Sequence, residues 1–222
     1  MMTRRRLVLC LAVCLVGCAR EDRRAEPVQQ APPLAPRQAP VDGRPVIVAF
    51  GDSLTAGHGA TFSYTDFLQK ELDGKGYLYR VVNQGISGDT TSGGVTRIDA
   101  AVRLRPKVVI LELGANDGLR GLPVETTRAN LAEMIDSCQR AGARVLLCGM
   151  TLPRNYGPDY IGSFESIFQD LAREKKTALV GFFLEGVATR SDLMQPDGLH
   201  PTVEGNARVA LHVMKYLEPL LK

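Results

Sequence analysis

Beyond residue 45, the chain alternates between short apolar runs and longer stretches in which apolar residues recur every three or four positions. Short apolar runs that end at a turn predict buried strands, and the longer periodic stretches predict amphipathic helices. The predicted strands cover residues 46–50, 79–83, 107–113, 144–150 and 178–182. The predicted helices cover residues 64–72, 91–104, 127–140, about 160–175, and a last stretch from about residue 202 onwards.

This alternation predicts a parallel sheet that is covered by helices on both faces. Five such strands indicate a three-layer α/β/α domain of the flavodoxin-like kind over residues 45–222, without an internal repeat. Ligands of such domains bind beyond the carboxyl ends of the strands, so residues that directly follow a strand are the candidates for chemistry.

The first 44 residues lack this pattern. Three arginines at positions 4–6 precede an apolar run over residues 7–17, which is too short to cross a bilayer of about 30 Å and is typical of a secretory signal. Residues 15–18 (LVGC) resemble the bacterial lipobox, which implies cleavage after residue 17 and lipidation of Cys18. A plain signal peptide that contains cysteines is the alternative. Residues 18–44, rich in proline, glutamine and charge, predict a disordered tether.

Charge and cysteine spacing exclude other classes of protein. The chain has 27 basic and 24 acidic residues, and its surplus equals the three arginines of the removable segment. The remaining chain is balanced, which gives no sign of nucleic-acid binding. Cys138 lies on the apolar face of a predicted helix and Cys148 on a predicted strand, without a CxxC pair or an HxxxH spacing in the chain. We therefore expect core cysteines, no metal site and no cofactor.

The segment after the first predicted strand, residues 51–55 (GDSLT), places Ser53 between a strand and a helix. A lone serine in this position is more often a helix N-cap than a nucleophile. Thr55 stands where the G-x-S-x-G elbow of α/β-hydrolases has its second glycine, so the segment does not fit that motif.

The segments after the second and third predicted strands are also polar and rich in glycine. Residues 85–90 (GISGDT) contain Gly88 and predict a tight turn that matches neither common glycine-rich phosphate-binding pattern. Asn116 lies in residues 114–117 (GAND), and asparagine is also an ordinary turn residue.

Asp197 and His200 lie three residues apart, just before the last predicted helix. At this spacing the carboxylate can hold one ring nitrogen while the other nitrogen points at a nucleophile. Pro201 suits the first turn of the following helix and biases His200 away from helical geometry. With Ser53, these residues supply a nucleophile, a base and an orienting carboxylate.

Taken together, these segments resemble the four blocks of the SGNH/GDSL hydrolases, with Ser53, Gly88, Asn116 and His200 at the four naming positions. The resemblance covers nearly the whole predicted domain and is closest to the bacterial multifunctional thioesterase/lysophospholipase branch, which includes arylesterases. It implies that Ser53 attacks an acyl carbonyl, that His200 is the base, and that Asp197 orients His200. It further implies an oxyanion hole made of the Ser53 and Gly88 backbone N–H groups and the Asn116 side-chain amide.

The loop after the fourth predicted strand, residues 152–158 (LPRNYGP), contains the proline and glycine of a surface connection. In the resembling branch this loop borders the acyl groove, which implies substrate contacts from Leu152, Pro153 and Tyr156. An ordinary connection between two elements is the alternative.

The expected function is hydrolysis of carboxylic esters and thioesters, including aryl esters, acyl thioesters and lysophospholipids, through an acyl-enzyme on Ser53. Removal of O-acetyl groups from an envelope polysaccharide is an alternative that uses the same mechanism. A non-catalytic binding lipoprotein is the alternative of another class, and an intact Ser53, Asp197 and His200 argue against it. Cys18 followed by Ala19 predicts attachment to the periplasmic side of the outer membrane, with the bilayer as partner.

Overall fold

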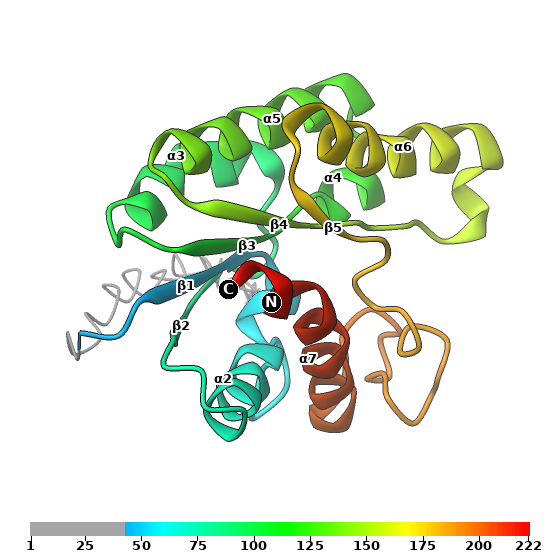
Figure 1. Ribbon diagram of the computed structural model, residues 1–222. Coiled ribbons are helices and arrows are strands. Elements are labelled where there is room, and N and C mark those ends of the chain that lie inside the picture. Colours follow the sequence, from blue (N-terminus) through cyan, green and yellow to red (C-terminus); the bar gives the residue numbers. More distant parts are fainter. Residues whose placement is uncertain (1–42) are drawn as a thin grey trace, which may run out of the picture. The chain divides into compact units, whose positions relative to one another are not determined.

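The computed structural model describes residues 43–222, which form a five-stranded parallel sheet with the strand order β2-β1-β3-β4-β5 (Figure 1). This is the flavodoxin-like order that the alternating pattern predicts. The strands are β1 Val46–Gly51, β2 Arg80–Gly85, β3 Val108–Glu112, β4 Arg144–Cys148 and β5 Ala178–Val180. The predicted signal segment, Cys18 and the tether up to residue 42 lie outside the described residues.

Helices cover both faces of the sheet, which confirms the predicted three-layer arrangement (Figure 1). Helices α3, α5 and α6 lie side by side on one face, and α2 packs against α7 on the other. These long helices are α2 Tyr64–Gly74, α3 Thr91–Val102, α5 Val124–Arg140, α6 Pro158–Lys175 and α7 Val203–Leu217.

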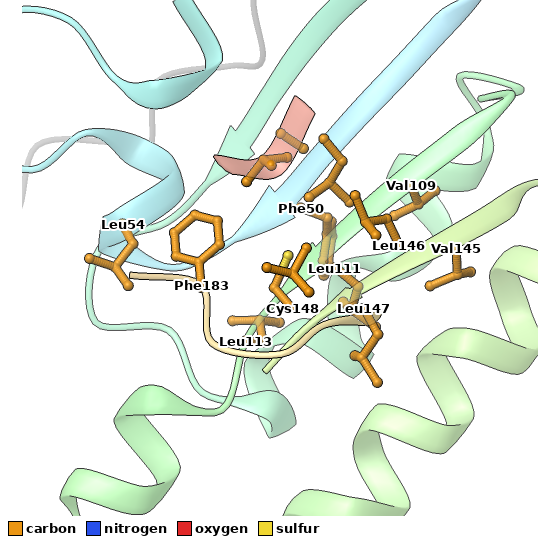
Figure 2. Close-up of a cluster of buried hydrophobic side chains, with 14 of the residues drawn as sticks. Phe50, Leu54, Val109, Leu111, Leu113, Val145, Leu146, Leu147, Cys148 and Phe183 are labelled. Carbon is orange, nitrogen blue, oxygen red and sulfur yellow. The ribbon is translucent and has the colours of Figure 1, made fainter. Parts of the chain in front are cut away.

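The core lies on both sides of the inner strands. Every residue of β1 and of β3 is buried, and a strand that is buried on both faces is apolar at consecutive positions rather than at alternate ones. Figure 2 shows part of this core, where Phe50 of β1, Leu111 of β3 and Leu147 of β4 gather near Phe183. The tight packing of β1 and β3 gives the residues that follow them a rigid base.

Several short elements were not predicted by the apolar pattern, because fewer than two helical turns show no periodicity. Helix α5 also begins three residues before the predicted start, directly after its N-cap Pro123. The short elements are α1 Ser53–Ala56, α4 Ala115–Leu119 and the 3-10 turns Arg154–Tyr156 and Glu218–Leu220.

Cys138 and Cys148 are buried and unpaired, as expected of core residues. Burial raises the pKa of Cys138 to about 12 and raises the pKa of Cys148 as well, so both thiols stay protonated and unreactive near neutral pH. Over residues 43–222, no helix is long and apolar enough to cross a membrane. The same residues contain no group of three or more His, Cys, Asp or Glu side chains that could hold a metal ion.

Candidate active site

The polar segments that follow β1, β2 and β3 lie at the carboxyl edge of the sheet. Strands β1 and β3 are neighbours in the sheet, although β2 lies between them in sequence. The next long helix after β1 is α2, which covers one face, whereas α5 after β3 covers the other (Figure 1). This is the topological switch point where ligands of such folds bind, and Ser53 and Asn116 flank it.

The turn that follows β1 exposes the hydroxyl group of Ser53. Asp52 caps helix α1, because its carboxylate accepts a hydrogen bond of 3.0 Å from the Leu54 N–H. The capping role open to a lone serine therefore belongs to Asp52, and the Ser53 hydroxyl has another partner. The turn packs closely on the strand end, since a Cβ at Gly51 would lie 2.1 Å from Thr55 Oγ1. Glycine is needed there for α1 to begin directly at the end of β1.

Ser53, His200 and Asp197 form a continuous chain of hydrogen bonds. Ser53 Oγ lies 2.8 Å from His200 Nε2, and His200 Nδ1 lies 2.7 Å from Asp197 Oδ2. The other carboxylate oxygen of Asp197 accepts the N–H groups of Leu199 at 2.9 Å and His200 at 3.0 Å. The bond from the His200 ring, followed by these backbone bonds, lowers the pKa of Asp197 to about 2. The carboxylate therefore stays ionised and holds the His200 ring in a fixed orientation.

The loop that carries His200 is held in place by Gln195, a residue that the sequence analysis did not single out. The backbone N–H of Gln195 donates to the His200 carbonyl at 2.7 Å, and Met194 and Pro201 pair as an antiparallel bridge. The Gln195 side-chain amide donates to the carbonyls of Pro201 at 2.9 Å and His58 at 2.7 Å. Because His58 follows the Ser53 turn, Gln195 connects the loop that carries His200 to the segment that carries Ser53.

Two residues whose backbone N–H groups are uncommitted line a common cavity with the Ser53 hydroxyl. Ser53 and Gly88 both line this cavity, and within residues 43–222 neither N–H has a protein acceptor. Gly88 has a φ of +79°, a conformation that side chains other than glycine rarely adopt. Uncommitted N–H groups at a helix start and a glycine turn are suited to an anionic oxygen.

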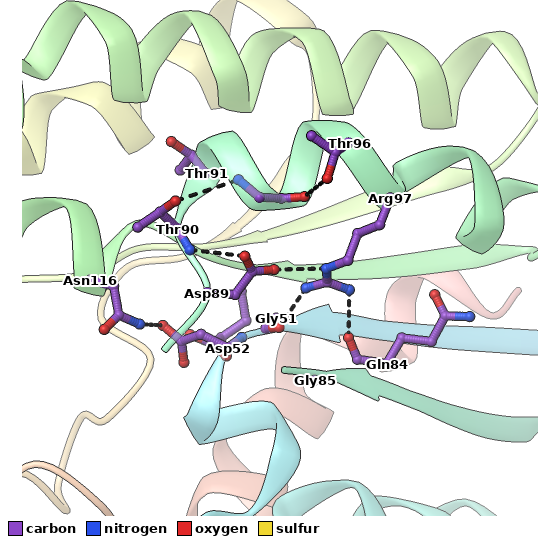
Figure 3. Close-up of polar contacts among 12 residues, drawn as sticks. Gly51, Asp52, Gln84, Gly85, Asp89, Thr90, Thr91, Thr96, Arg97 and Asn116 are labelled. Atoms are coloured by element: carbon purple, nitrogen blue, oxygen red, sulfur yellow. Dashed lines mark hydrogen bonds and ion pairs between the residues drawn. The ribbon is translucent and has the colours of Figure 1, made fainter. Parts of the chain in front are cut away.

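Asn116, on helix α4, also lines the cavity. Its side-chain Nδ2 donates to Asp52 Oδ2 at 3.0 Å (Figure 3). An amide nitrogen carries two hydrogens, so this bond orients the group and leaves the second hydrogen for a ligand. Burial raises the pKa of Asp52 to about 6, while the bonds from Leu54 and Asn116 act in the opposite direction.

Glu112, the last residue of β3, is fully buried beside this turn and was also not singled out from the sequence. Its Oε2 accepts the Thr55 hydroxyl at 2.7 Å and the Asp52 N–H at 3.3 Å. Burial, with a further contribution from the Asp52 carboxylate, raises the pKa of Glu112 well above its usual range. Burial therefore favours the protonated form of Glu112 beside the Asp52 carboxyl group.

The cavity at the Ser53 hydroxyl has a volume of about 440 Å³ and a mostly apolar wall. Leu152 and Pro153 belong to this wall, whereas Tyr156 does not line it. Instead, the Tyr156 hydroxyl donates to the carbonyl of Leu119 at 2.6 Å, and Leu119 does line the cavity. The apolar part of the wall comprises Leu54, Ala115, Leu119, Met150, Leu152, Pro153, Phe182, Leu184, Ala188, Met194 and Leu199.

Comparison with known proteins identifies the family of the chain. The sequence profile of the GDSL-like lipase/acylhydrolase family matches residues 49–208, which run from the second half of β1 to the first turns of α7. The chain belongs to this family. Its GDSL segment is the Ser53 turn, and family members are ester hydrolases that form acyl-enzymes, so this protein is a serine esterase.

Individual relatives within the GDSL family cover nearly the same part of the chain. The protein is 45% identical to esterase TesA of Pseudomonas aeruginosa, over 79% of this chain and 89% of that protein. It is 36% identical to thioesterase 1/protease 1/lysophospholipase L1 of Escherichia coli K12, over 79% of this chain and 84% of the relative. The crystal structure of the psychrotrophic esterase EstA from Pseudoalteromonas sp., inhibited by monoethylphosphonate, superposes with a TM-score of 0.76 and 34% identity, covering 79% of this chain and 98% of EstA.

Proposed function

We propose that this GDSL esterase hydrolyses acyl esters and thioesters through an acyl-enzyme on Ser53, with His200 as the general base and Asp197 as its orienting carboxylate. The observation that carries the proposal is the pair of hydrogen bonds, 2.8 Å and 2.7 Å, that links the three side chains at the edge of the cavity. A serine whose hydroxyl contacts an imidazole held by a carboxylate is an activated nucleophile.

The reaction follows from this arrangement. His200 Nε2 takes the hydroxyl proton as Ser53 Oγ bonds to the acyl carbon, and the carbonyl oxygen becomes an oxyanion beside the Ser53 and Gly88 N–H groups and the Asn116 amide. When the intermediate collapses, the bond to the leaving oxygen or sulfur breaks and the imidazolium returns its proton to that atom. A water molecule then attacks the acyl-enzyme by the same route, which releases the acid and restores Ser53.

The cavity favours substrates with an apolar acyl or aryl portion. An acetyl group would leave most of the apolar wall unfilled, so removal of acetyl groups from a polysaccharide is the less favoured reaction. Thioesters and lysophospholipids fit the same description, and the Escherichia coli relative is named for both activities.

A substrate panel with a matched pair of serine variants tests this function. We expect nitrophenyl esters and acyl-CoA with medium chains to be turned over faster than acetate esters or acetylated glycans, because longer chains bury more apolar surface. A fluorophosphonate should label wild-type enzyme at Ser53. Ser53→Ala should abolish both labelling and turnover, whereas Ser166→Ala, which removes an exposed serine on α6, should change neither.

Turnover by Ser53→Ala at the wild-type rate would contradict the nucleophile assignment. An enzyme that is labelled at Ser53 but prefers acetylated glycan would retain the mechanism and replace the proposed substrate class.

We also infer that Cys18 carries lipid and holds the domain at the periplasmic side of the outer membrane. The inference is supported by residues 15–18 (LVGC), which follow three arginines and a short apolar run, and by Ala19 directly after the cysteine. Several acyl chains on one residue would bind a bilayer firmly, whereas a single chain would not.

A further inference from the structure

Arg97 is a half-buried arginine that hydrogen-bonds to three residues in two segments at the carboxyl edge of the sheet (Figure 3). It lies on α3, and its Nε donates to Asp89 Oδ2 at 2.7 Å. Its two terminal nitrogens donate to backbone carbonyls, Nη1 to Gln84 and Nη2 to Gly51, each at 2.8 Å. The guanidinium also lies over the Phe50 ring, 3.8 Å from the ring centroid, so each nitrogen and one face of the group have a partner.

The three acceptors adjoin the backbone groups assigned to the oxyanion. Gly51 is the last residue of β1, two positions before Ser53. Gln84 and Asp89 lie on either side of Gly88, in the strand end and the turn that carry it. Arg97 therefore connects the segment that carries the Ser53 N–H to the segment that carries the Gly88 N–H.

We propose that Arg97 is a positioning residue for the oxyanion hole, which fixes the Ser53 N–H relative to the Gly88 N–H by binding the strand end and the turn that carry them. The proposal rests on the oxyanion roles assigned to Ser53 and Gly88 above. Arg97 does not line the cavity, so it acts on the substrate only through these two segments.

The chemistry of the side chain supports this role over that of a simple ion pair. A guanidinium is planar and presents its donors at fixed angles, so three acceptors in different directions are held in one relative arrangement. The Arg97 and Asp89 side chains are only 18% and 11% exposed, and charge-assisted bonds with little solvent around them are strong and well ordered. Lysine would keep the charge opposite Asp89 but cannot reproduce the fixed fork.

The test compares Arg97→Lys with Arg144→Lys. Arg144 is a matched control, because its Nη1 also donates to two backbone carbonyls, those of Leu220 and Lys222, but at the opposite edge of the sheet. Each variant is assayed on a nitrophenyl ester, with the enzyme concentration taken from fluorophosphonate titration. A second substrate replaces the carbonyl oxygen by sulfur, a weak hydrogen-bond acceptor that gains little from the oxyanion donors.

For Arg97→Lys we expect kcat on the oxygen ester to fall about tenfold to a hundredfold. The displaced Ser53 and Gly88 N–H groups would stabilise the oxyanion less well, and that charge exists only in the transition state. KM should stay within about threefold, and the preference for the oxygen ester over the thiono ester should fall by the same factor as kcat. Arg144→Lys should leave kcat, KM and this preference at wild-type values, whatever its effect on Tm.

An Arg97→Lys enzyme with wild-type kcat and wild-type oxygen preference would overturn the proposal, even if its Tm were lower. If Arg97→Lys does not fold, Asp89→Asn decides, because it removes the charge from one of the three acceptors and should lower kcat and the oxygen preference together. A wild-type enzyme that is not labelled at Ser53 would refute the proposed nucleophile, and with it the oxyanion role on which the proposal for Arg97 rests.

Discussion

At the scale of single residues, the site depends on side chains that orient the residues proposed to react with the substrate. Asp52 is an example, because it caps α1 through the Leu54 N–H and also orients the Asn116 amide. The Asn116 amide therefore donates to a buried carboxyl group that the Leu54 N–H also holds. Asn116 is thus turned toward the cavity before a substrate arrives.

Asn116→Ala should lower kcat by about a hundredfold to a thousandfold, with a small change in KM, because one of three oxyanion donors is lost. The measurement is steady-state kinetics per mole of titrated Ser53. Asn130→Ala is the matched control, since the Asn130 amide donates to two side chains, Thr91 and Ser92, away from the cavity. Wild-type kcat in a folded Asn116→Ala enzyme would show that Asn116 is a turn residue.

At the scale of elements, the loop between β4 and α6 contributes to the cavity in two ways. Leu152 and Pro153 form part of the wall directly, whereas Tyr156 reaches the wall through its bond to the carbonyl of Leu119. The ring of Tyr156 also stacks on that of Tyr160, with centroids 6.3 Å apart. The loop therefore determines where helix α4 ends against the cavity.

Tyr156→Ala should change the preference for acyl chain length more than it changes stability, because it frees Leu119 at the cavity wall. The measurement is kcat/KM across acetyl, butyryl, octanoyl and longer nitrophenyl esters, together with Tm. Tyr77→Ala is the control, since the Tyr77 hydroxyl bonds to Glu218 away from the cavity. An unchanged chain-length profile in Tyr156→Ala would exclude this loop from substrate selection.

Most of the fold could be predicted from the sequence, because strands buried on both faces leave continuous apolar runs. Ser53, Gly88 and Asn116 could be found because each lies in the polar, glycine-containing segment that follows a predicted strand. Glu112, Gln195 and Arg97 could not, since their partners lie 57, 137 and 46 residues away and depend on which strand ends and loops become neighbours. The apolar pattern predicts the strands but contains no information about these contacts.

At the scale of the whole molecule, the proposed anchor joins the esterase to a membrane surface through a segment of about 26 residues, 19–44, which precedes the domain. A tether of this composition raises the local concentration of the enzyme near lipids without adding a contact to the active site. The anchor and the catalytic chemistry should therefore be separable by mutation.

Cys18→Ala should release the protein from the membrane fraction of a bacterial host and leave kcat on a water-soluble nitrophenyl ester unchanged. The measurements are fractionation and mass spectrometry of the amino terminus. Cys14→Ala, which changes a cysteine of the same apolar run, should remain lipidated and membrane-bound. An unmodified amino terminus in purified wild-type protein would refute the lipoprotein assignment.

The nucleophile and the base come from opposite ends of the domain, 147 residues apart, with Ser53 after the first strand and His200 just before the last helix. A domain cut before residue 197 would contain the proposed nucleophile and the proposed oxyanion donors but not the proposed base, and α2 would lack α7, which packs against it. Catalysis therefore requires that both ends of the domain be in place, so ester turnover reports the complete fold.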